Sequence, residues 1–420
     1  MSSAFSIALS SLQANSDAIN TTGNNLANLN TTGFKSSNID FQTLVSEQLG
    51  GSGAQGEYGL GVAAPINQQI FSQGTLQSSS SPLSAAIQGN GFFVVSDANN
   101  QQLYTRDGDF TLNSSGVLQT QTGQNVQGWM TTQNGINTTG APGNIVIPTG
   151  TVLAPVATQN FSVNANLNSN AIAGTSDGTF TTPMQVVDSL GTEHQLTVTF
   201  TKSTTTPNEW SYQVSIPSAD VGGAAGTQTN LLATPGTIDF NTDGTMSTAN
   251  GTAPVALSVT GLSDGAANLG MNWNLFNSGV GTITQYGQTS ATATSTQDGS
   301  TGAQFTGVAI QSGGQIVATF SNGQQKVEGQ LAMAAIQNPE TLENVGNNNF
   351  TVSAATSIPA VGVPQTGGRG QVIGSSLEGS NVDMATNFTN LIIYQRGYQA
   401  SSKVITTADQ MGQTLLDLIH

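Results

Sequence analysis

The sequence predicts a mainly β protein with paired terminal α-helices. Its domains are nested and discontinuous: a helical coiled-coil end and two β domains, with the outer domains each made of two chain segments. Two observations lead to this prediction. Apolar residues follow helical spacing only near the two ends of the 420-residue chain. Between the ends, short alternations of apolar and polar residues and frequent Gly-rich turns are typical of β-strands. At roughly 100–200 residues per domain, the length suits two or three domains.

The first expected element is a helix over about residues 2–29. Its apolar residues recur every seven positions, with two neighbours that widen the stripe: Phe5, Ala8, Leu9, Leu12, Ile19 and Leu26. Asn30 and Gly33 favour turn or left-handed conformations, so the helix should end there.

A second helix is expected to close the chain, from Met384 to His420. Two neighbouring apolar rows follow heptad spacing along it: Leu391, Tyr398, Ile405 and Ile419 in one row, and Tyr394, Ala408 and Leu415 in the other. Gly412 interrupts the first row. Both helices should have on the order of seven turns or more.

The two helices allow two interpretations, either core helices of one globular domain or an assembly surface. The rest of the chain offers little helical core for them to join, and two terminal helices can pair with each other as a coiled coil. Such pairing would still leave some apolar residues without a partner in the chain: Ile7, Leu29, Ile392, Val404 and Met411. We therefore predict self-assembly through the ends. The residues expected to carry it are Phe5, Leu9, Leu12, Ile19, Leu26, Leu29, Leu391, Tyr394, Tyr398, Ile405, Ala408 and Leu415.

Changes of pattern along the chain suggest where the domains begin and end. Residues 1–33 and 380–420 should form the terminal helical assembly domain, and residues 34–72 a connector. The connector is rich in Gly and has no sustained period. It should therefore be a loop or a β-ribbon that is ordered by its neighbours.

The middle of the chain should contain two β domains. Residues 73–148 and 298–379 are expected to form the first, and residues 149–297 a second that is inserted into it. In the insertion, His194–Phe200 and Trp210–Ile216 alternate as in an antiparallel sheet with one buried face.

Composition excludes several classes of partner. The net charge is −16, and the seven Lys and Arg residues are spread singly along the chain. Neither nucleic-acid binding nor a polybasic membrane anchor is expected, because both need clustered basic residues. The absence of Cys rules out disulfides, thiol catalysis and Cys-ligated metals.

The sequence also gives no sign of a membrane segment or a cleaved leader. No stretch approaches the ~18 apolar residues of a membrane span. The N-terminus has neither a basic region nor an unbroken apolar region, so we expect export by a route that leaves it intact.

Two motifs suggest ligand sites, both weakly. Gly51–Gly56 satisfies G-x-G-x-x-G, but the helix-like Phe41–Leu49 precedes it where a dinucleotide site needs a strand. Asp239–Asp243 resembles the start of a calcium loop. Asn250 stands where that loop needs a bidentate acid, so a hairpin turn is the simpler interpretation.

The other candidate catalytic residues are isolated. His194 and His420 lack ligand spacing and a Ser-centred nucleophile motif. Asp107 and Asp109 flank Gly108 in an expected turn, although sequence spacing alone does not exclude glycosidase chemistry. We predict no enzyme, no cofactor and no metal.

Several motifs resemble those of the bacterial flagellar axial proteins, which build the rod and the hook. Asn24–Lys35 ("NNLANLNTTGFK") is similar to the N-terminal signature of that family, and Ser380–Ile419 is similar to its C-terminal signature. Pro82–Val95 and Tyr104–Trp129 resemble its first β domain, and Leu377–Asp383 ("LEGSNVD") resembles the entry to its last helix.

The family divides by what lies in the middle. Rod proteins are shorter, whereas hook-type members insert a further β domain, and Met184–Lys202 resembles that insertion. Ser218–Ser300 matches no motif.

The resemblance implies a hook-type subunit that self-assembles into a curved helical tube, a universal joint between rod and filament. It also implies partners: further copies of the chain, distal rod, hook cap and hook–filament junction proteins, and the flagellar export apparatus. The implied location is extracellular, in the hook. The alternatives are a distal rod-type subunit and a secreted β-rich binding module or adhesin.

Overall fold

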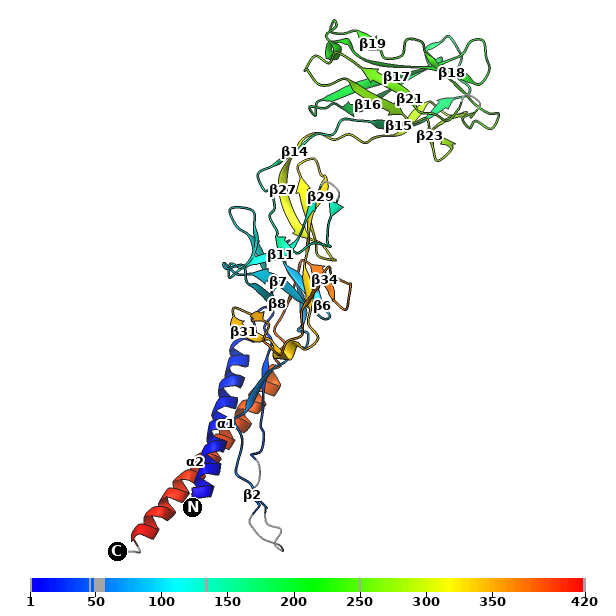
Figure 1. Ribbon diagram of the computed structural model, residues 1–420. Helices are drawn as coiled ribbons and strands as arrows, with labels where there is room; N and C mark the ends of the chain where they lie inside the picture. Colours follow the sequence, from blue (N-terminus) through cyan, green and yellow to red (C-terminus); the bar gives the residue numbers. More distant parts are fainter. Residues whose placement is uncertain (1, 45–46, 49–56, 133–134, 249–250, 418–420) are drawn as a thin grey trace. The chain divides into compact units, whose positions relative to one another are not determined.

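The computed structural model describes residues 2–44, 47–48, 57–132, 135–248 and 251–417. The chain divides into two compact units. Unit 1 contains residues 1–149, 307–319 and 325–420, and unit 2 contains residues 150–306 and 320–324. Figure 1 shows both helices, α1 and α2, which belong to unit 1. Over its described residues, neither helix combines the length and the apolarity that a membrane span requires.

The elements of unit 1 lie at both ends of the sequence. Before the insertion they are α1 (Ser2–Ala27), β1 (Ser37–Asp40), β2 (Glu47–Gln48), β3 (Glu57–Tyr58), β4 (Ile66–Gln69), β5 (Leu76–Ser78), β6 (Ala85–Gln88), β7 (Phe92–Ser96), β8 (Gln102–Thr105), β9 (Phe110–Leu112), β10 (Leu118–Thr120), β11 (Asn125–Thr132), β12 (Gly135–Ile136) and β13 (Gly143–Asn144). After the insertion they are β27 (Ala303–Ile310, which begins in unit 2), β28 (Gln315–Phe320), β29 (Gln325–Leu331), β30 (Met333–Ala335), η3 (Pro339–Thr341), β31 (Glu343–Gly346), β32 (Asn349–Thr351), β33 (Ala360–Gly362), β34 (Gln371–Gly374), β35 (Ser376–Glu378) and α2 (Met384–Asp417).

The elements of unit 2 are mostly strands. They are β14 (Val152–Leu153), β15 (Asn160–Asn168), η1 (Ser176–Gly178), β16 (Thr179–Val187), β17 (Glu193–Lys202), β18 (Glu209–Pro217), η2 (Ser218–Val221), β19 (Gln228–Asn230), β20 (Gly236–Asp239), β21 (Val255–Val259), β22 (Leu269–Trp273), β23 (Phe276–Asn277), β24 (Val280–Gly281), β25 (Ile283–Tyr286) and β26 (Ala291–Gln297).

The two long terminal helices are confirmed, with 26 residues in α1 and 34 in α2. Gly33 has a φ of 68°, the left-handed conformation expected where the chain leaves α1. The helix-like appearance of Phe41–Leu49 is misleading. Its described residues contain only the short strand β2, which pairs with β3.

The connector forms an antiparallel β-ribbon, one of the two structures that its composition allowed. β1 pairs with β4 from Ser37 opposite Gln69 to Asp40 opposite Ile66. Residues 49–56, which include the Gly51–Gly56 motif, lie outside the described residues.

The β part of unit 1 is built from both halves of the chain. Its main sheet has the order β27-β28-β29-β11-β7-β8-β32-β31. All five residues of the central strand β7 are buried, as the apolar run in "GFFVV" predicts. Its Phe92 packs edge-on against Phe71 and Phe350, which come from opposite ends of the sequence. This shared core joins the two halves of the chain.

Unit 2 is a sandwich of two sheets around one core. One sheet is antiparallel, in the order β16-β17-β18-β19, and β20 also pairs with β18. Inward-facing residues alternate along β17 and β18, as their sequences predict. The second sheet is mixed. In it, β15 pairs in parallel with β22 and β25, which alternation in the sequence did not reveal.

Aromatic rings from both sheets meet at Trp273, which is fully buried. The Trp273 ring stacks on Phe161, with 6.0 Å between ring centroids. Phe200 and Tyr212, from the facing sheet, contact it edge-on at 6.1 and 5.1 Å. Such contacts add to the stabilisation that burial of apolar area provides.

We expect Trp273→Ala to lower the free energy of unfolding of unit 2 by about 3–5 kcal/mol, because it leaves a large cavity. Urea unfolding of the full chain measures the change. Trp210 reports on unit 2 and Trp129 on unit 1, and only the unit 2 transition should move to lower urea. Ile172→Ala is the control, because Ile172 is 67% exposed. An equal shift in both variants would contradict the role given to Trp273.

Candidate functional site

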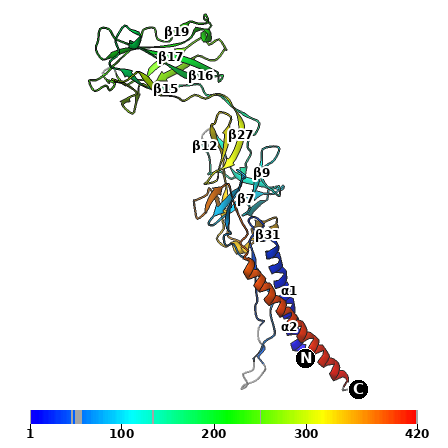
Figure 2. The same ribbon diagram turned by 180° about the vertical axis from the view of Figure 1, so that it is seen from behind.

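The two terminal helices pack against each other in antiparallel orientation, and both views show them side by side (Figures 1 and 2). Asn25 Nδ2 donates to Asn387 Oδ1 over 3.2 Å. Two heptads earlier on α1, the Ser11 hydroxyl oxygen lies 2.9 Å from that of Ser401, two heptads later on α2. Equal steps along both helices keep one face of each in contact, as in a coiled coil.

Small and polar side chains fill the seam between the helices. The buried residues of α1 are Ala8, Ala14, Ala18, Thr22 and Asn25. On α2, a Cβ added to Gly397 would lie 2.6 Å from Asn15 Oδ1, so a larger residue there would displace the Asn15 side chain. The distance between helix axes depends on the side chains at the contact, and here they allow a close approach.

The apolar residues predicted to mediate self-assembly differ in how far the helix pair buries them. Phe5 and Leu9 are 44% and 51% exposed, and Tyr398 is 38% exposed. The remaining predicted residues with described side chains are half-buried: Leu12, Ile19, Leu26, Leu29, Leu391, Tyr394, Ile405 and Ala408. Leu415 lies outside the described side chains. The helices pair as expected, and hydrogen bonds between polar side chains cross the seam. The set of residues that mediates self-assembly stays a prediction.

An apolar surface therefore remains on the outside of the helix pair. Among its large side chains, those at least one third exposed are Phe5, Leu9, Met384, Phe388, Ile392, Ile393, Tyr398, Val404 and Met411. We call this set the outer apolar surface. Three of its members, Ile392, Val404 and Met411, were expected to lack a partner in the chain. Large apolar side chains that are exposed in this number on two helices are candidates for contacts with other molecules.

The β1–β4 ribbon runs beside the helices and is attached to α1 near each of its ends. Asn25 exchanges two hydrogen bonds with the Ser37 backbone, at 2.7 and 3.0 Å. The Val62 N–H donates to Ser10 Oγ over 3.3 Å. Phe41 packs against Tyr394 of α2, with 5.8 Å between ring centroids. The ribbon thus belongs to the same assembly as the helix pair.

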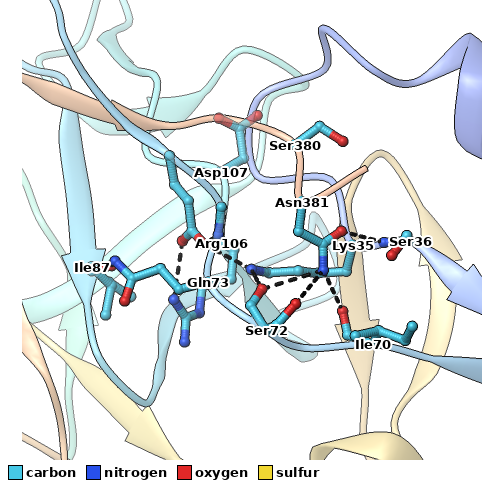
Figure 3. Close-up of polar contacts among 12 residues, drawn as sticks. Lys35, Ser36, Ile70, Ser72, Gln73, Ile87, Arg106, Asp107, Ser380 and Asn381 are labelled. Atoms are coloured by element: carbon cyan, nitrogen blue, oxygen red, sulfur yellow. Dashed lines mark hydrogen bonds and ion pairs between the residues drawn. The ribbon is translucent and has the colours of Figure 1, made fainter. Parts of the chain in front are cut away.

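A buried ion cluster connects both helices to the β part of unit 1. Glu378 Oε1 lies 2.7 Å from Lys35 Nζ, and Oε2 lies 3.0 Å from a guanidinium nitrogen of Arg106. The side chains of Lys35 and Glu378 are fully buried, and that of Arg106 is 4% exposed. We call these three residues the Glu378 cluster. Figure 3 shows Lys35 and Arg106 approaching from different parts of the chain.

Backbone groups complete the Glu378 cluster. The Gly74 N–H donates to Glu378 Oε1 over 2.9 Å, and the Gly33 N–H donates to the Glu378 carbonyl over 2.8 Å. Lys35 Nζ also donates to the Ser72 carbonyl over 2.8 Å. The cluster thus joins the segment after α1, the end of the ribbon and the strand β35 that leads to α2. Each charged group of the cluster is paired, since an unpaired buried charge is costly, although Arg106 Nε has no hydrogen-bond partner.

The cluster shifts the ionisation of its lysine. Burial lowers the pKa of the Lys35 ammonium, while the charge and the hydrogen bond of Glu378 oppose this effect. Arg106 is additionally placed over the Phe92 ring, 5.4 Å from its centroid, in a cation–π contact. The cluster was missed in the sequence, where Lys35 and Glu378 lie 343 positions apart.

The segment Leu377–Asp383 carries two further contacts that define the start of α2. Asn381 accepts a hydrogen bond from the Ser36 N–H (2.7 Å) and donates to the Ile70 carbonyl (2.8 Å), as Figure 3 shows. Asp383 Oδ1 accepts from the Thr386 N–H over 2.6 Å and so caps the helix. The hydrogen bonds from Thr386 lower the pKa of Asp383. Within seven residues, Glu378 pairs with the buried cations, Asn381 bonds to the segment after α1 and to the ribbon, and Asp383 caps α2.

Asp107 lies beside the Glu378 cluster, in the turn that the sequence predicts for Asp107 and Asp109. Burial raises its pKa to about 6, and the nearby Asp109 charge adds to this effect, although the Asp109 N–H hydrogen bond opposes it. A Cβ on Gly33 would lie 2.6 Å from the Asp107 nitrogen, so the chain after α1 passes directly over this turn.

The remaining sequence candidates have structural roles or new neighbours. Asp239–Asp243 forms the expected hairpin turn, in which Asp243 Oδ1 accepts from the Thr245 N–H over 2.9 Å. Asn250 and His420 lie outside the described residues. For His194 the sequence predicts no metal. The structure places it next to the carboxylates of Asp188, six positions before it, and of the more distant Asp220 and Asp264.

Four family models match segments of the chain. They are the Flagella basal body rod protein (residues 5–35), the Flagellar hook protein FlgE/F/G D1 domain (86–166), the Flagellar basal body protein FlaE D2 domain (157–300) and the Flagellar basal body rod FlgEFG protein C-terminal (374–418). The second and third of these cover most of the β structure in the middle of the chain.

Relatives match over nearly the whole length. The chain is 32% identical to the Flagellar hook protein FlgE of Treponema pallidum, over 98% of each chain. It is 31% identical to the protein of the same name from Salmonella typhimurium, over 99% of each. The crystal structure of Helicobacter pylori flagellar hook protein FlgE2 matches with a TM-score of 0.50 and 15% identity, covering 71% of this chain and 99% of that one. This last likeness concerns the fold alone.

We expect Glu378→Gln to destabilise unit 1 by about 3–5 kcal/mol, because it leaves two buried cations without a counter-charge. Urea unfolding followed through Trp129 measures the loss. Hydrogen exchange at the Gly74 amide, which donates to the lost oxygen, should accelerate. Glu340→Gln is the control, since Glu340 is exposed. Stability within about 1 kcal/mol of the parent would show that the cluster contributes little.

We expect Asp107→Asn to stabilise unit 1 at pH 7 by about 1–3 kcal/mol, since it removes a carboxylate that is costly to ionise when buried. The folded pKa of about 6 exceeds the ordinary 3.8. Asp107 therefore does not lower the free energy of unfolding at a pH below its ordinary pKa. Its destabilising effect grows as the pH rises to about 6.

The measurement is the difference in unfolding free energy between Asp107→Asn and the parent chain at several pH values. It should be near zero at acid pH and level off above the folded pKa. A difference that does not change with pH would contradict the raised pKa.

Proposed function

The chain belongs to the flagellar hook protein family, and from this premise we propose how it serves as a structural subunit of the bacterial flagellar hook. Copies of the chain assemble through their terminal helices into a curved helical tube. The tube acts as a universal joint between rod and filament. The observation that carries this proposal is the outer apolar surface on a helix pair whose own seam is small and polar.

The seam explains why assembly requires other copies. Burial of apolar area contributes about 25 cal/mol per Å², and alanine, serine and asparagine bury little of it. Pairing with each other thus stabilises α1 and α2 only weakly. Neighbouring subunits would cover the outer apolar surface and supply the missing burial. The helices should therefore become fully ordered on assembly, as in other coupled folding and binding.

The predicted self-assembly residues fit this mechanism in a modified form. Phe5, Leu9 and Tyr398 are exposed and would contact other subunits directly. The half-buried ones, such as Ile19 and Ile405, border the seam and would be closed off by neighbours.

The Glu378 cluster gives the helix pair a mechanical role. A torque applied to the helices reaches the β part of unit 1 through Lys35, Glu378 and Arg106, and through Asn381. Close-packed interiors have low compressibility, so this junction resists twisting. Bending instead requires neighbouring subunits to slide. A chain with only 7% charged residues can form few ion pairs between subunits that would hinder sliding.

The proposed partners follow from this position in the flagellum. They are further copies of the chain, distal rod proteins, hook cap proteins and hook–filament junction proteins, together with the flagellar export apparatus. We place the assembled protein outside the cell, exported without a cleaved signal peptide, with neither nucleic acid nor membrane insertion involved. The family is structural, and we assign the chain no enzymatic activity. Relatives that match over its full length favour a hook subunit over a rod-type subunit or an adhesin.

We expect the double substitution Leu9→Asp and Ile393→Asp to raise the critical concentration for tube formation at least about tenfold, equivalent to roughly 1.4 kcal/mol per subunit added. An assembled tube would bury both carboxylates in an apolar contact. Electron microscopy and sedimentation of polymers measure the effect, after salting out the purified chain.

The matched control is Leu9→Met with Ile393→Leu, which keeps both positions apolar. Unfolding of the β parts should be unaffected in both variants, since Leu9 and Ile393 are 51% and 57% exposed. Curved tubes from the parent and the control would support the hook proposal, whereas straight tubes would favour a rod. Normal polymers from the aspartate variant would refute assembly through this surface.

A further inference from the structure

A second buried polar cluster lies in unit 2, where three connecting segments meet around one histidine. Asp188 begins the turn between β16 and β17, and His194 is on β17. Asp220 belongs to η2, and Asp264 lies in the loop between β21 and β22. Backbone contacts hold these segments together. The Ser263 N–H donates to the Asp220 carbonyl over 2.8 Å.

The imidazole of His194 directs its two nitrogens toward different carboxylates. Nε2 lies 3.1 Å from Asp188 Oδ2 and 4.0 Å from Asp264 Oδ2. Nδ1 lies 3.1 Å from Asp220 Oδ2. The ring and Asp188 are buried, at 6% and 0% side-chain exposure, while Asp264 is 26% exposed. One donor atom each from Asp188, His194 and Asp264 lies within 4.8 Å of the other two.

The backbone fixes which carboxylate oxygens face the ring. Asp188 Oδ1 accepts from the Leu190 and Thr192 N–H groups, at 2.8 and 2.9 Å. Asp264 Oδ1 accepts from the Ala266 N–H over 3.0 Å. The Oδ2 atoms of both residues are thereby directed at Nε2 of His194.

The cluster holds more negative than positive charge. In the described part of the chain, the His194 ring is the only cationic group within ion-pair distance of these three carboxylates. Three carboxylates thus surround one imidazole, and two of them face its Nε2.

We propose that Asp188, His194 and Asp264 bind a divalent transition-metal ion of the zinc class, with Asp220 as a positioning residue. Nε2 and two carboxylate oxygens are ligands that Zn²⁺ accepts, at about 2.0–2.2 Å, so pairs of ligand atoms lie roughly 3–4 Å apart. The separations of 3.1 and 4.0 Å from Nε2 match this spacing. An imidazole ligand favours zinc over calcium, which takes six to eight oxygens.

Asp220 completes the arrangement. With the metal on Nε2, the proton of the neutral ring is on Nδ1 and is donated to Asp220, which fixes the tautomer and the ring orientation. Three protein ligands leave a fourth position for water. The partial exposure of Asp264 gives the ion a path to enter. Bound metal would tie three connections of unit 2 together and stabilise its folded state. This inference rests on unit 2 alone and does not require the hook assignment.

The test uses the untagged full chain, freed of metal with a chelator and titrated with Zn²⁺ alone by isothermal calorimetry. We expect one ion per chain and a rise in the thermal midpoint of the unit 2 transition. Co²⁺ serves as a spectroscopic probe and should give the absorption of a low-coordinate site. Asp264→Asn should weaken binding at least about a hundredfold. Asp220→Asn, which keeps all three ligands, should weaken it by about 10–100-fold.

Two controls separate this site from weak surface binding. Asp243→Asn changes another aspartate of unit 2, in an exposed turn, and His420→Asn removes the other histidine of the chain. Neither should change the affinity. Circular dichroism confirms that Asp264→Asn is folded.

Absence of saturable one-to-one binding to the parent chain would overturn the proposal, because a proton on Nε2 would then account for the cluster. Equal affinity in the parent and in a folded Asp264→Asn would overturn it as well.

Discussion

The architecture of unit 1 depends on one buried carboxylate. Glu378 holds a lysine from the segment after α1 and an arginine from the β part, and its own backbone leads into α2. Without this pairing, two cations would be buried in a site that cannot hydrate them. The close approach of Gly33 and Gly74 brings backbone N–H groups to the same residue. The chain ends are therefore fixed to the β part by geometry and charge together.

The seam of the helix pair has the opposite character. It is held by contacts between small side chains and by hydrogen bonds such as Ser11–Ser401, with little apolar burial. A rigid attachment at one end of the helices is thus combined with a weakly stabilised pair along their length. This combination suits a subunit whose own chain sets the orientation of its helices, while neighbouring subunits supply the apolar burial that stabilises them.

Much of the fold was predictable from the sequence, because periodicity reports local structure. The ends of α1 and α2, the buried strand β7 and the alternation in β17 all follow from patterns a few residues long. The parallel pairing of β15 was not predictable, because strand order depends on contacts across the whole insertion.

The candidate sites were harder to predict than the fold. Apolar spacing predicts the residues with which α1 and α2 would meet other molecules, but it did not point to the polar side chains that bond across the seam. Ser11, Ala18 and Asn25 also recur every seven positions, and this signal was available but is weaker than that of leucine and isoleucine. The Glu378 cluster and the carboxylates around His194 join residues distant in sequence. No spacing rule detects these, since each member is ordinary in its local context.

The chain has only seven Lys and Arg residues, and their positions show which contacts they make. Lys35 and Arg106 form buried ion pairs with Glu378, and Lys202 donates to two backbone carbonyls of its own unit. Four of the seven basic residues remain, and two of these, Arg396 and Lys403, are exposed on α2. Contacts in the proposed tube would therefore combine these few charges with apolar area, which is insensitive to direction, and with short polar side chains. A joint that bends at every revolution needs contacts that shift without breaking fixed ion pairs. In the proposed tube, the buried ion pairs of the Glu378 cluster would stiffen the junction inside each subunit, and they would not link one subunit to the next.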